Sequence, residues 1–176
     1  MAGLATDGVR EAPPPPGEVD AGVRWTVQHA ASGSPWWREH FRRAGVDPGS
    51  ISGVADLPRL PFSTKTDLRA SYPLGWVSVP DSALVRVHAS SGTTGKRTVC
   101  AYTRGDLEDW TEQFARCFAM AGVTSSDRVQ VMVGYGLWTA GAGFQAGAER
   151  IGAMVIPTGP GNLDLQLEMM RDLGAT

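Results

Sequence analysis

The chain has 176 residues, of which 42% are hydrophobic, and it carries a formal net charge of −2. This length suits one domain of ordinary size. The weak negative charge argues against binding to nucleic acids, which requires a basic face. The N-terminus has no basic region followed by a long apolar run, so we expect no secretion signal. Glycines interrupt the uncharged stretch 129–148, which argues against a membrane span. We therefore expect a cytoplasmic protein that contacts neither nucleic acid nor membrane.

The N-terminal part is predicted to be helical after a disordered tail. Residues 1–18 are rich in Ala, Gly and Pro, and their run of prolines favours an extended chain. Apolar residues at helical spacing predict a helix over residues 19–31. Ser34 then occupies the N-cap position of a second helix, and Gly45 is placed to end that helix.

Some residues with charged or reactive side chains are interpreted as structural. A capping box that begins at Thr64 predicts a short helix over residues 65–70, so Lys65 is expected to be exposed in its first turn. Cys100 and Cys117 lie too far apart in the sequence to form a metal-binding knuckle. We expect them to be buried free thiols in a reducing compartment.

The most distinctive stretch lies between two β-prone runs, residues 83–87 and 98–103. It contains hydroxyl side chains, two glycines and a lysine but no acidic residue: Ser90, Ser91, Gly92, Thr93, Thr94, Gly95 and Lys96. A loop of this composition can turn its backbone N–H groups toward an anion. The glycines tolerate positive φ, and the lysine adds a mobile charge. Phosphate oxygens are therefore the expected ligands.

The spacing of this stretch differs from the common P-loop, because Arg97 lies five residues after Gly92 where that pattern needs glycine. A flexible hairpin turn rich in Ser and Thr is the alternative interpretation, and spacing alone does not decide between the two. His88 precedes the loop at a strand end, and we interpret it as a hydrogen-bonded structural histidine.

Beyond the loop, helices and strands alternate. Apolar residues recur at helical spacing between Thr103 and Gly122, and Glu112 falls on the expected solvent side. The segments predicted after this helix are a strand over 129–133, a helix over 138–151, a strand over 154–156 and a helix over 163–173. This order predicts an α/β fold with parallel-sheet βαβ units. Small residues should let the helix over 138–151 pack closely on the sheet, with Trp138 and Phe144 in the core or in a pocket wall.

Residues 90–96 resemble the phosphate-binding loop of the adenylate-forming superfamily, which includes acyl-CoA synthetases, luciferases and the adenylation domains of peptide synthetases. Further segments resemble one branch, the phenylacetate–CoA ligases: residues 60–69, 72–75, 88–92, 134–137 and 147–150. The resemblance extends from about residue 19 to the end of the chain. Arg97 departs from the family pattern, which usually has proline after the loop lysine.

The resemblance implies an incomplete N-terminal AMP-binding domain over residues 19–176, with the phosphate loop at 88–98 and no C-terminal domain. It also implies an ATP-dependent ligase that joins an acid to coenzyme A through an acyl-adenylate, with Mg²⁺ as the metal ion. The adenylation lysine of the family would lie beyond this chain. We therefore expect no catalytic and no metal-binding residue here, and no activity from the chain alone.

Tyr135 and Gly136 are the candidate residues for binding the acid. They follow the predicted strand over 129–133, and ligands of parallel sheets bind beyond the C-terminal ends of the strands. In the phenylacetate–CoA ligases an aromatic residue here is thought to contact the substrate ring, so the resemblance implies a pocket for an aromatic carboxylic acid. An aromatic residue that only packs against the loop is the alternative.

Two other functions stay open. A relative of these ligases could transfer the acyl group to another acceptor, such as an amine, a carrier-protein thiol or a flavin-type cofactor. The chain could instead be a non-catalytic module that binds a phosphate or a partner protein. An unfinished sheet exposes apolar surface and an open strand edge. We therefore expect a poorly behaved monomer, or else a homodimer or a completing chain.

Overall fold

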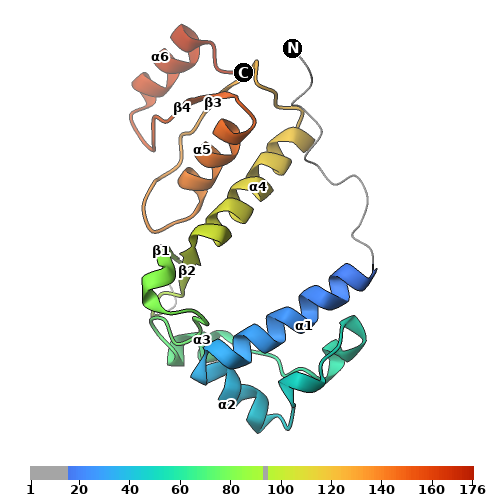
Figure 1. Cartoon of the computed structure of the whole chain (residues 1–176). Helices are drawn as coiled ribbons and strands as arrows, with labels where there is room; N and C mark the ends of the chain where they lie inside the picture. Colours follow the sequence, from blue (N-terminus) through green and yellow to red (C-terminus); the bar gives the residue numbers. More distant parts are fainter. Residues whose placement is uncertain (1–15, 93–94) are drawn as a thin grey trace. The chain divides into compact units, whose positions relative to one another are not determined.

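A computed structural model describes residues 16–92 and 95–176, which form two compact units (Figure 1). The N-terminal unit ends at Ala101, and the C-terminal unit begins at Tyr102. None of the helices in the described ranges is both long enough and apolar enough to cross a membrane.

The N-terminal unit begins with helices α1 (Pro16–Gly33) and α2 (Pro35–Arg43). α1 begins at Pro16, so the prediction that the disordered tail extends to residue 18 is wrong. The helix can include this proline because proline is well tolerated in the first turn of a helix. Residues 1–15, to which the rest of that prediction refers, lie outside the described residues. The predicted ends of α2 are confirmed, because Ser34 is its N-cap and Gly45 follows it with φ of 68°.

Ser34 connects the junction of these helices to a distant segment. Its side chain is fully buried, and its hydroxyl oxygen accepts the N–H of Trp37 at 3.4 Å. The same hydroxyl donates to the carbonyl oxygen of Gly75 at 2.9 Å. The backbones also approach closely here, since a Cβ placed at Gly33 would lie 1.9 Å from the carbonyl oxygen of Ser78. One buried serine therefore serves as both a helix cap and a tertiary contact.

The core of the N-terminal unit lies where α1 and α2 meet the following segment. Val27, Phe41 and Ile51 are buried together. Partly buried apolar residues surround them: Val23, Ala30, Ala31, Trp37, Val46 and Leu60. Nearby, Trp36 stacks on Trp76 with ring centroids 4.6 Å apart. This stacked pair joins α2 to the segment that Ser34 contacts.

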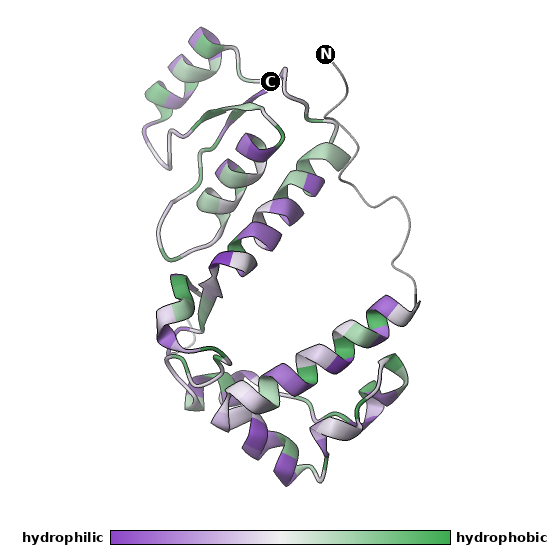
Figure 2. Ribbon diagram, in the orientation of Figure 1, coloured by the Kyte–Doolittle hydropathy of each residue, from purple (hydrophilic) through white to green (hydrophobic). Residues whose placement is uncertain are grey.

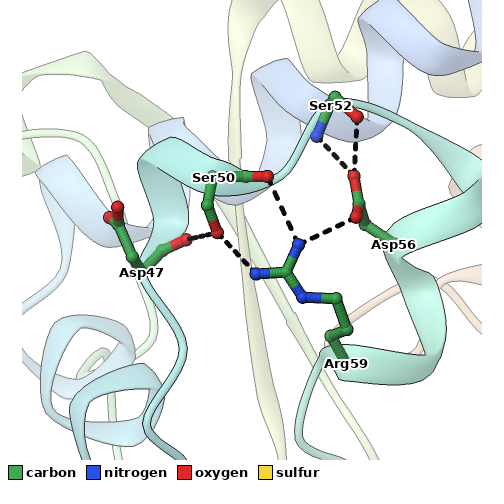
Figure 3. A network of polar contacts seen from close by, with 5 residues as sticks. All are labelled: Asp47, Ser50, Ser52, Asp56 and Arg59. Atoms are coloured by element: carbon green, nitrogen blue, oxygen red, sulfur yellow. Dashed lines mark hydrogen bonds and ion pairs between the residues drawn. The ribbon is translucent and has the colours of Figure 1, made fainter.

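A polar network shapes the two 3₁₀ helices η1 (Pro48–Ser50) and η2 (Val54–Arg59). Arg59 donates to a carboxylate oxygen of Asp56 at 2.9 Å and to the hydroxyl of Ser50 at 2.7 Å (Figure 3). Ser52 donates its N–H and its hydroxyl to the other oxygen of Asp56, both at 2.7 Å. These bonds from Ser52, together with that from Arg59, hold the pKa of Asp56 well below its usual range.

The remaining elements of this unit are α3 (Lys65–Ala70), η3 (Asp81–Ala83), β1 (Leu84–Ala89) and the first part of β2 (Val99–Thr103), whose last two residues belong to the C-terminal unit. The predicted capping box is confirmed, because Thr64 Oγ1 accepts the N–H of Asp67 and Asp67 accepts the N–H of Thr64 at 2.7 Å. Lys65 is exposed, as predicted. β1 and β2 pair in a two-stranded sheet.

The C-terminal unit contains, in order, α4 (Arg104–Met120), β3 (Arg128–Gln130), α5 (Ala140–Arg150), β4 (Met154–Ile156) and α6 (Leu163–Leu173) (Figure 1). β3 and β4 are parallel, with Val129 opposite Val155. The predicted parallel βαβ unit is therefore confirmed. β3 is shorter than predicted because β4, its neighbour in the sheet, ends opposite Gln130.

Helix α5 packs closely on α4, on which hydrophilic residues recur from turn to turn (Figure 2). A Cβ placed at Gly143 would lie 2.5 Å from the ring of Phe114. One placed at Gly147 would lie 2.5 Å from Phe114 Cβ and 2.9 Å from the backbone nitrogen of Ala115. The predicted close packing of these glycines is therefore present, but the prediction that they face the sheet is wrong, because they face α4. Glycines at helical spacing do not reveal which neighbouring element they contact.

An ion-pair network crosses the same helix pair. Glu112 accepts from Arg116 at 3.1 Å, one turn later in α4, and from Arg150 of α5 at 3.2 Å. The prediction that Glu112 is merely solvated is therefore wrong. The face of α4 that carries Glu112 was predicted to point to solvent, but it faces the C-terminal end of α5, where Arg150 lies.

Some residues that were expected to be buried are exposed. Cys100 and Cys117 both face solvent. Trp138 and Phe144 were predicted to lie in the core or in a pocket wall, and they are 58% and 38% exposed. Phe144 lines a cavity together with Phe118, so the pocket-wall alternative holds for it. For Cys117 the cause is the contact of α4 with α5, which buries Ala115 and turns the cysteine outward.

Gln166 anchors α6 to β3 and to the loop after β4. Its side chain is 6% exposed, and its Oε1 accepts from Gln130 at 2.7 Å and from Thr158 at 2.6 Å. Its Nε2 donates to the carbonyl oxygens of Gly159 and Gly161 at 2.8 and 3.0 Å. A buried amide must be satisfied to be tolerated, and here its partners fix the position of α6.

We predict that Ser34→Ala destabilises the protein by about 1–3 kcal/mol, because it removes a helix cap and a buried hydrogen bond. Denaturant unfolding followed by circular dichroism measures the change. Ser32→Ala is the matched control, since the hydroxyl of Ser32 is exposed and bonds only locally to His29. Equal unfolding midpoints for the two variants would contradict the prediction.

We predict that Gly147→Ala costs about 1–3 kcal/mol, because its Cβ would collide with the backbone of α4. Gly105→Ala serves as the control, since its Cβ would meet no atom closer than 3.9 Å. Alanine is the better helix former, so this control should be neutral or stabilising. Thermal unfolding compares the variants, and an unchanged melting temperature for Gly147→Ala would refute the close packing.

Candidate functional site

The loop between β1 and β2 is closed at its base by hydrogen bonds to Ser90. The N–H of Ser90 donates to the carbonyl oxygen of Thr98 at 3.0 Å, and the N–H of Thr98 donates to Ser90 Oγ at 2.9 Å. Nη1 of Arg97 donates to the carbonyl oxygen of Ser90 at 2.9 Å. Ser90 therefore has a structural role in holding the loop closed. Its predicted role in ligand binding stays a prediction.

The two loop glycines adopt the left-handed conformations that the sequence predicts. Gly92 has φ of 75° and Gly95 has φ of 127°, and the N–H of Gly95 donates to the carbonyl oxygen of Gly92 at 3.1 Å. A side chain at either position would be strained. Ser91 is exposed beside them. Thr93 and Thr94, which the sequence analysis assigned to the same site, lie outside the described residues.

Cationic side chains surround this turn. The Nζ of Lys96 lies 5.4 Å from the ring centroid of Tyr72, within the range of a cation–π contact. A Cβ placed at Gly95 would lie 3.6 Å from Cζ of Arg69. One placed at Gly92 would lie 2.8 Å from Cγ of Arg97. The absence of side chains at the glycines thus lets two arginines approach the loop backbone.

Sequence reasoning did not assign Arg69 to the site. It belongs to α3, which the capping box predicts correctly, but its contact with Gly95 spans 26 residues and leaves no local signal. The only available indication was the resemblance of residues 60–69 to the ligase signature, which carried no role for the arginine. Arg69 adds a guanidinium with several donors, a group that suits phosphate oxygens.

His88 lies near the end of β1, just before the loop. It is 4% exposed, and this burial agrees with the predicted structural role. Within residues 16–92 and 95–176, no group of three or more His, Cys, Asp or Glu side chains could hold a metal ion. The loop therefore presents N–H, hydroxyl and cationic groups, which suit an anion.

Tyr135 and Gly136 lie in the C-terminal unit, and the candidate phosphate loop lies in the N-terminal unit. The Tyr135 side chain is 43% exposed, and a Cβ placed at Gly141 would lie 3.2 Å from its ring. Burial of the hydroxyl raises the pKa of Tyr135, and the charge of Glu149 raises it further. Gly136 has φ of 142°. The contact of Tyr135 and Gly136 with an acid stays a prediction.

Known proteins resemble this chain over most of its length, although no protein-family model matches it. The phenylacetate-coenzyme A ligase of Escherichia coli (strain K12) is 44% identical over 150 residues, which are 85% of this chain and 34% of that protein. The enzyme of the same name from Thermus thermophilus is 46% identical over 138 residues, 78% of this chain and 31% of that protein. The chain is a homologue of part of the phenylacetate–coenzyme A ligases. It spans about a third of the length of these curated relatives.

Solved structures of 2-hydroxyisobutyryl-CoA ligase have the same fold as this ligase homologue. The structure in the postadenylation state with R3-HIB-AMP matches 98% of this chain with a TM-score of 0.79 and 27% identity. The structure with 2-HIB-AMP and CoA in the thioesterification state matches 93% with a TM-score of 0.77 and 29% identity. The chain covers 38% and 39% of those two chains.

We predict that Arg97→Ala loosens the base of the loop, because the bond from its guanidinium to Ser90 is lost. A hydrogen bond contributes about 0.5–1.5 kcal/mol, so exchange of the Ser90 amide hydrogen should become roughly two- to tenfold faster. Amide hydrogen exchange measured by NMR tests this. Arg24→Ala, which removes an exposed arginine of α1, is the control, and equal exchange in both variants would contradict the prediction.

Proposed function

We propose that the chain supplies the ATP phosphate-binding part of an AMP-forming ligase that joins an aryl acid to coenzyme A. The observation that carries this proposal is the closed loop, with two left-handed glycines and the cationic side chains of Arg69, Lys96 and Arg97 around it. The homology to phenylacetate–coenzyme A ligases supports the same assignment.

In the first half-reaction a carboxylate oxygen attacks the α-phosphorus of ATP, which forms an acyl-adenylate and releases pyrophosphate. Negative charge builds up on the departing phosphates, and donors that are already in position stabilise it without reorganisation. We assign this role to the backbone N–H of Gly92 and to the side chains of Ser90, Ser91, Thr93, Thr94 and Lys96, with Arg69 in addition. Gly95, whose N–H already donates to Gly92, keeps the loop open to the phosphates. In the second half-reaction the thiol of coenzyme A attacks the acyl carbon and releases AMP.

Mg²⁺ would accompany ATP and neutralise phosphate charge. The loop offers no carboxylate, and among the described residues no acidic cluster suits a cation. We therefore infer that the phosphate oxygens themselves would hold the ion, while the loop binds the phosphates through N–H and O–H donors.

The acid is proposed to be aromatic. The names of the curated relatives support phenylacetate or a similar acid, and Tyr135 and Gly136 are the residues that we propose to line its pocket. The solved neighbours are named for a small hydroxy acid, 2-hydroxyisobutyrate, so the shared fold does not select the acid. Another acceptor in place of coenzyme A would be indicated by release of AMP without any need for the thiol.

The remainder of the enzyme would come from polypeptide that this chain does not span. The relatives are about three times as long as the matched region. We propose that a completing polypeptide supplies the rest of the nucleotide site and the adenylation lysine. The test of activity is release of AMP by the completed enzyme, which should require both phenylacetate and coenzyme A.

We predict that the chain alone binds ATP and tripolyphosphate but not adenosine, because it holds the phosphates. Isothermal titration calorimetry measures the three affinities. Arg69→Ala and Lys96→Ala should each weaken binding of ATP roughly 10- to 100-fold, since a hydrogen bond to a charged group contributes about 1.5–3 kcal/mol.

The control for this prediction is Arg24→Gln, which removes an exposed arginine of α1 in the same unit. It should leave the affinity for ATP unchanged. Binding of adenosine as tight as that of ATP, or equal losses in all three variants, would contradict the assignment of the loop to phosphate.

A further inference from the structure

The segment that ends helix α3 places an aromatic ring beside the candidate phosphate loop. Tyr72 follows the C-cap of α3, and its N–H donates to the carbonyl oxygen of Arg69 at 3.4 Å. The Tyr72 side chain is 47% exposed. The Nζ of Lys96 lies over its ring, 5.4 Å from the centroid, and a ring attracts a cation at this distance. Arg69 and Tyr72 therefore both reach the loop from one short segment.

The turn that carries Tyr72 is anchored to the rest of the N-terminal unit. The N–H of Gly75 donates to the carbonyl oxygen of the α3 C-cap residue at 2.8 Å. The carbonyl oxygen of Gly75 accepts the hydroxyl of Ser34, a fully buried side chain, at 2.9 Å. The next residue, Trp76, stacks on Trp36 of α2 with ring centroids 4.6 Å apart. Tyr72 is thus held in place by contacts that do not involve the loop.

The backbone around Lys96 does little to restrain its side chain. Lys96 is exposed and follows Gly95, a residue with φ of 127°. The next residue is Arg97, which does not restrict the backbone of the lysine as a proline would. A lysine side chain has many rotamers, and it loses this freedom when it binds an anion. A contact that restrains Lys96 beforehand reduces that loss and so favours binding.

An aromatic ring restrains the ammonium group without neutralising it. A carboxylate in the same place would pair with Lys96 and repel phosphate, and residues 88–98 contain no acidic side chain. The ring of Tyr72 is neutral and attracts the cation through its quadrupole. Lysine has three N–H donors, so the donors that point away from the ring stay available to an anion.

We propose that Tyr72 is a positioning residue for the candidate phosphate loop. Its ring holds the ammonium of Lys96 beside the glycine turn before a polyphosphate binds, and it keeps this contact in the complex. Tyr72 touches no phosphate itself and acts through Lys96. The proposal rests on the proposed function, because it requires that Lys96 binds phosphate, and it adds to the site a residue from outside the loop.

The first test measures binding of tripolyphosphate to the 176-residue chain by isothermal titration calorimetry. Tyr72→Leu removes the ring and should weaken binding about two- to fivefold, as expected for a cation–π contact at an exposed site. Tyr72→Phe keeps the ring and should restore the affinity of the unaltered chain. Trp25→Leu removes a 64% exposed ring from α1 of the same unit, and this control should have no effect.

Three outcomes of this titration would overturn the proposal. Unchanged affinity in Tyr72→Leu would show that the ring contributes nothing to binding. Tighter binding by Tyr72→Leu would show that the ring competes with phosphate for Lys96. Equal losses in Tyr72→Leu and Tyr72→Phe would assign the effect to the hydroxyl group.

Double variants distinguish an effect through Lys96 from an effect through α3. Combined with Lys96→Ala, Tyr72→Leu should cause no further loss, because the ring then has no cation to hold. Combined with Arg69→Ala, it should still cause a loss of about two- to fivefold. A further loss with Lys96→Ala, or none with Arg69→Ala, would show that Tyr72→Leu disturbs the segment instead, and would overturn the proposal. Chemical-shift titration by NMR measures the weaker affinities.

Nuclear Overhauser effects observe the contact directly in the unaltered chain. Cross-peaks between the ε-protons of Lys96 and the ring protons of Tyr72 should be present without ligand and should remain when tripolyphosphate is bound. Their absence from the ligand-free chain, or their loss on binding, would overturn the proposal. This measurement decides the question if Tyr72→Leu does not fold, as judged by circular dichroism.

The positioning role and the proposed function fail in different ways. If the unaltered chain binds neither ATP nor tripolyphosphate, the phosphate role of the loop is refuted and the role of Tyr72 falls with it. If the unaltered chain binds both and the variants of Tyr72 do not behave as expected, only the positioning role is refuted.

Discussion

The hydrogen bonds that Ser90 makes with Thr98 and Arg97 hold together the two ends of the candidate phosphate loop. The rest of the site depends on this closure. With the base fixed, Gly92 and Gly95 can adopt positive φ and keep the loop backbone free of side chains. An anion then meets donors whose positions are set before it arrives, which is the arrangement that stabilises developing charge most effectively.

Arg97 changes how this closure is achieved. The family usually has proline at this position, which restricts the backbone at the loop exit by its ring. Here a guanidinium bonds across the loop to the carbonyl oxygen of Ser90 instead. A charged side chain therefore has a structural role at the candidate site, and the same positive charge adds to that of Arg69 and Lys96 around the turn.

In the C-terminal unit the helices are held firmly in place, but the sheet is small. The buried amide of Gln166 and the glycine contacts of α5 fix its helices, yet its parallel sheet has only two strands among the described residues. Sheets of this kind are normally covered on both faces by helices and flanked by further strands. The exposed side chains of Met132, Phe144 and Met154 in this unit are the consequence. They agree with homology to only about a third of a longer ligase.

The sequence by itself determined the ends of most helices, the parallel βαβ order and the position of the glycine turn. The capping box at Thr64, the N-cap at Ser34 and the spacing of apolar residues all act within a few residues, so local patterns are sufficient to predict them. The tertiary structure alone decided which helix the glycines of α5 face, that Glu112 pairs with Arg150, that Arg69 reaches Gly95 and that Thr176 lies beside Arg128. Those contacts join residues tens of positions apart, and their formation depends on how whole elements pack rather than on any local preference of the chain.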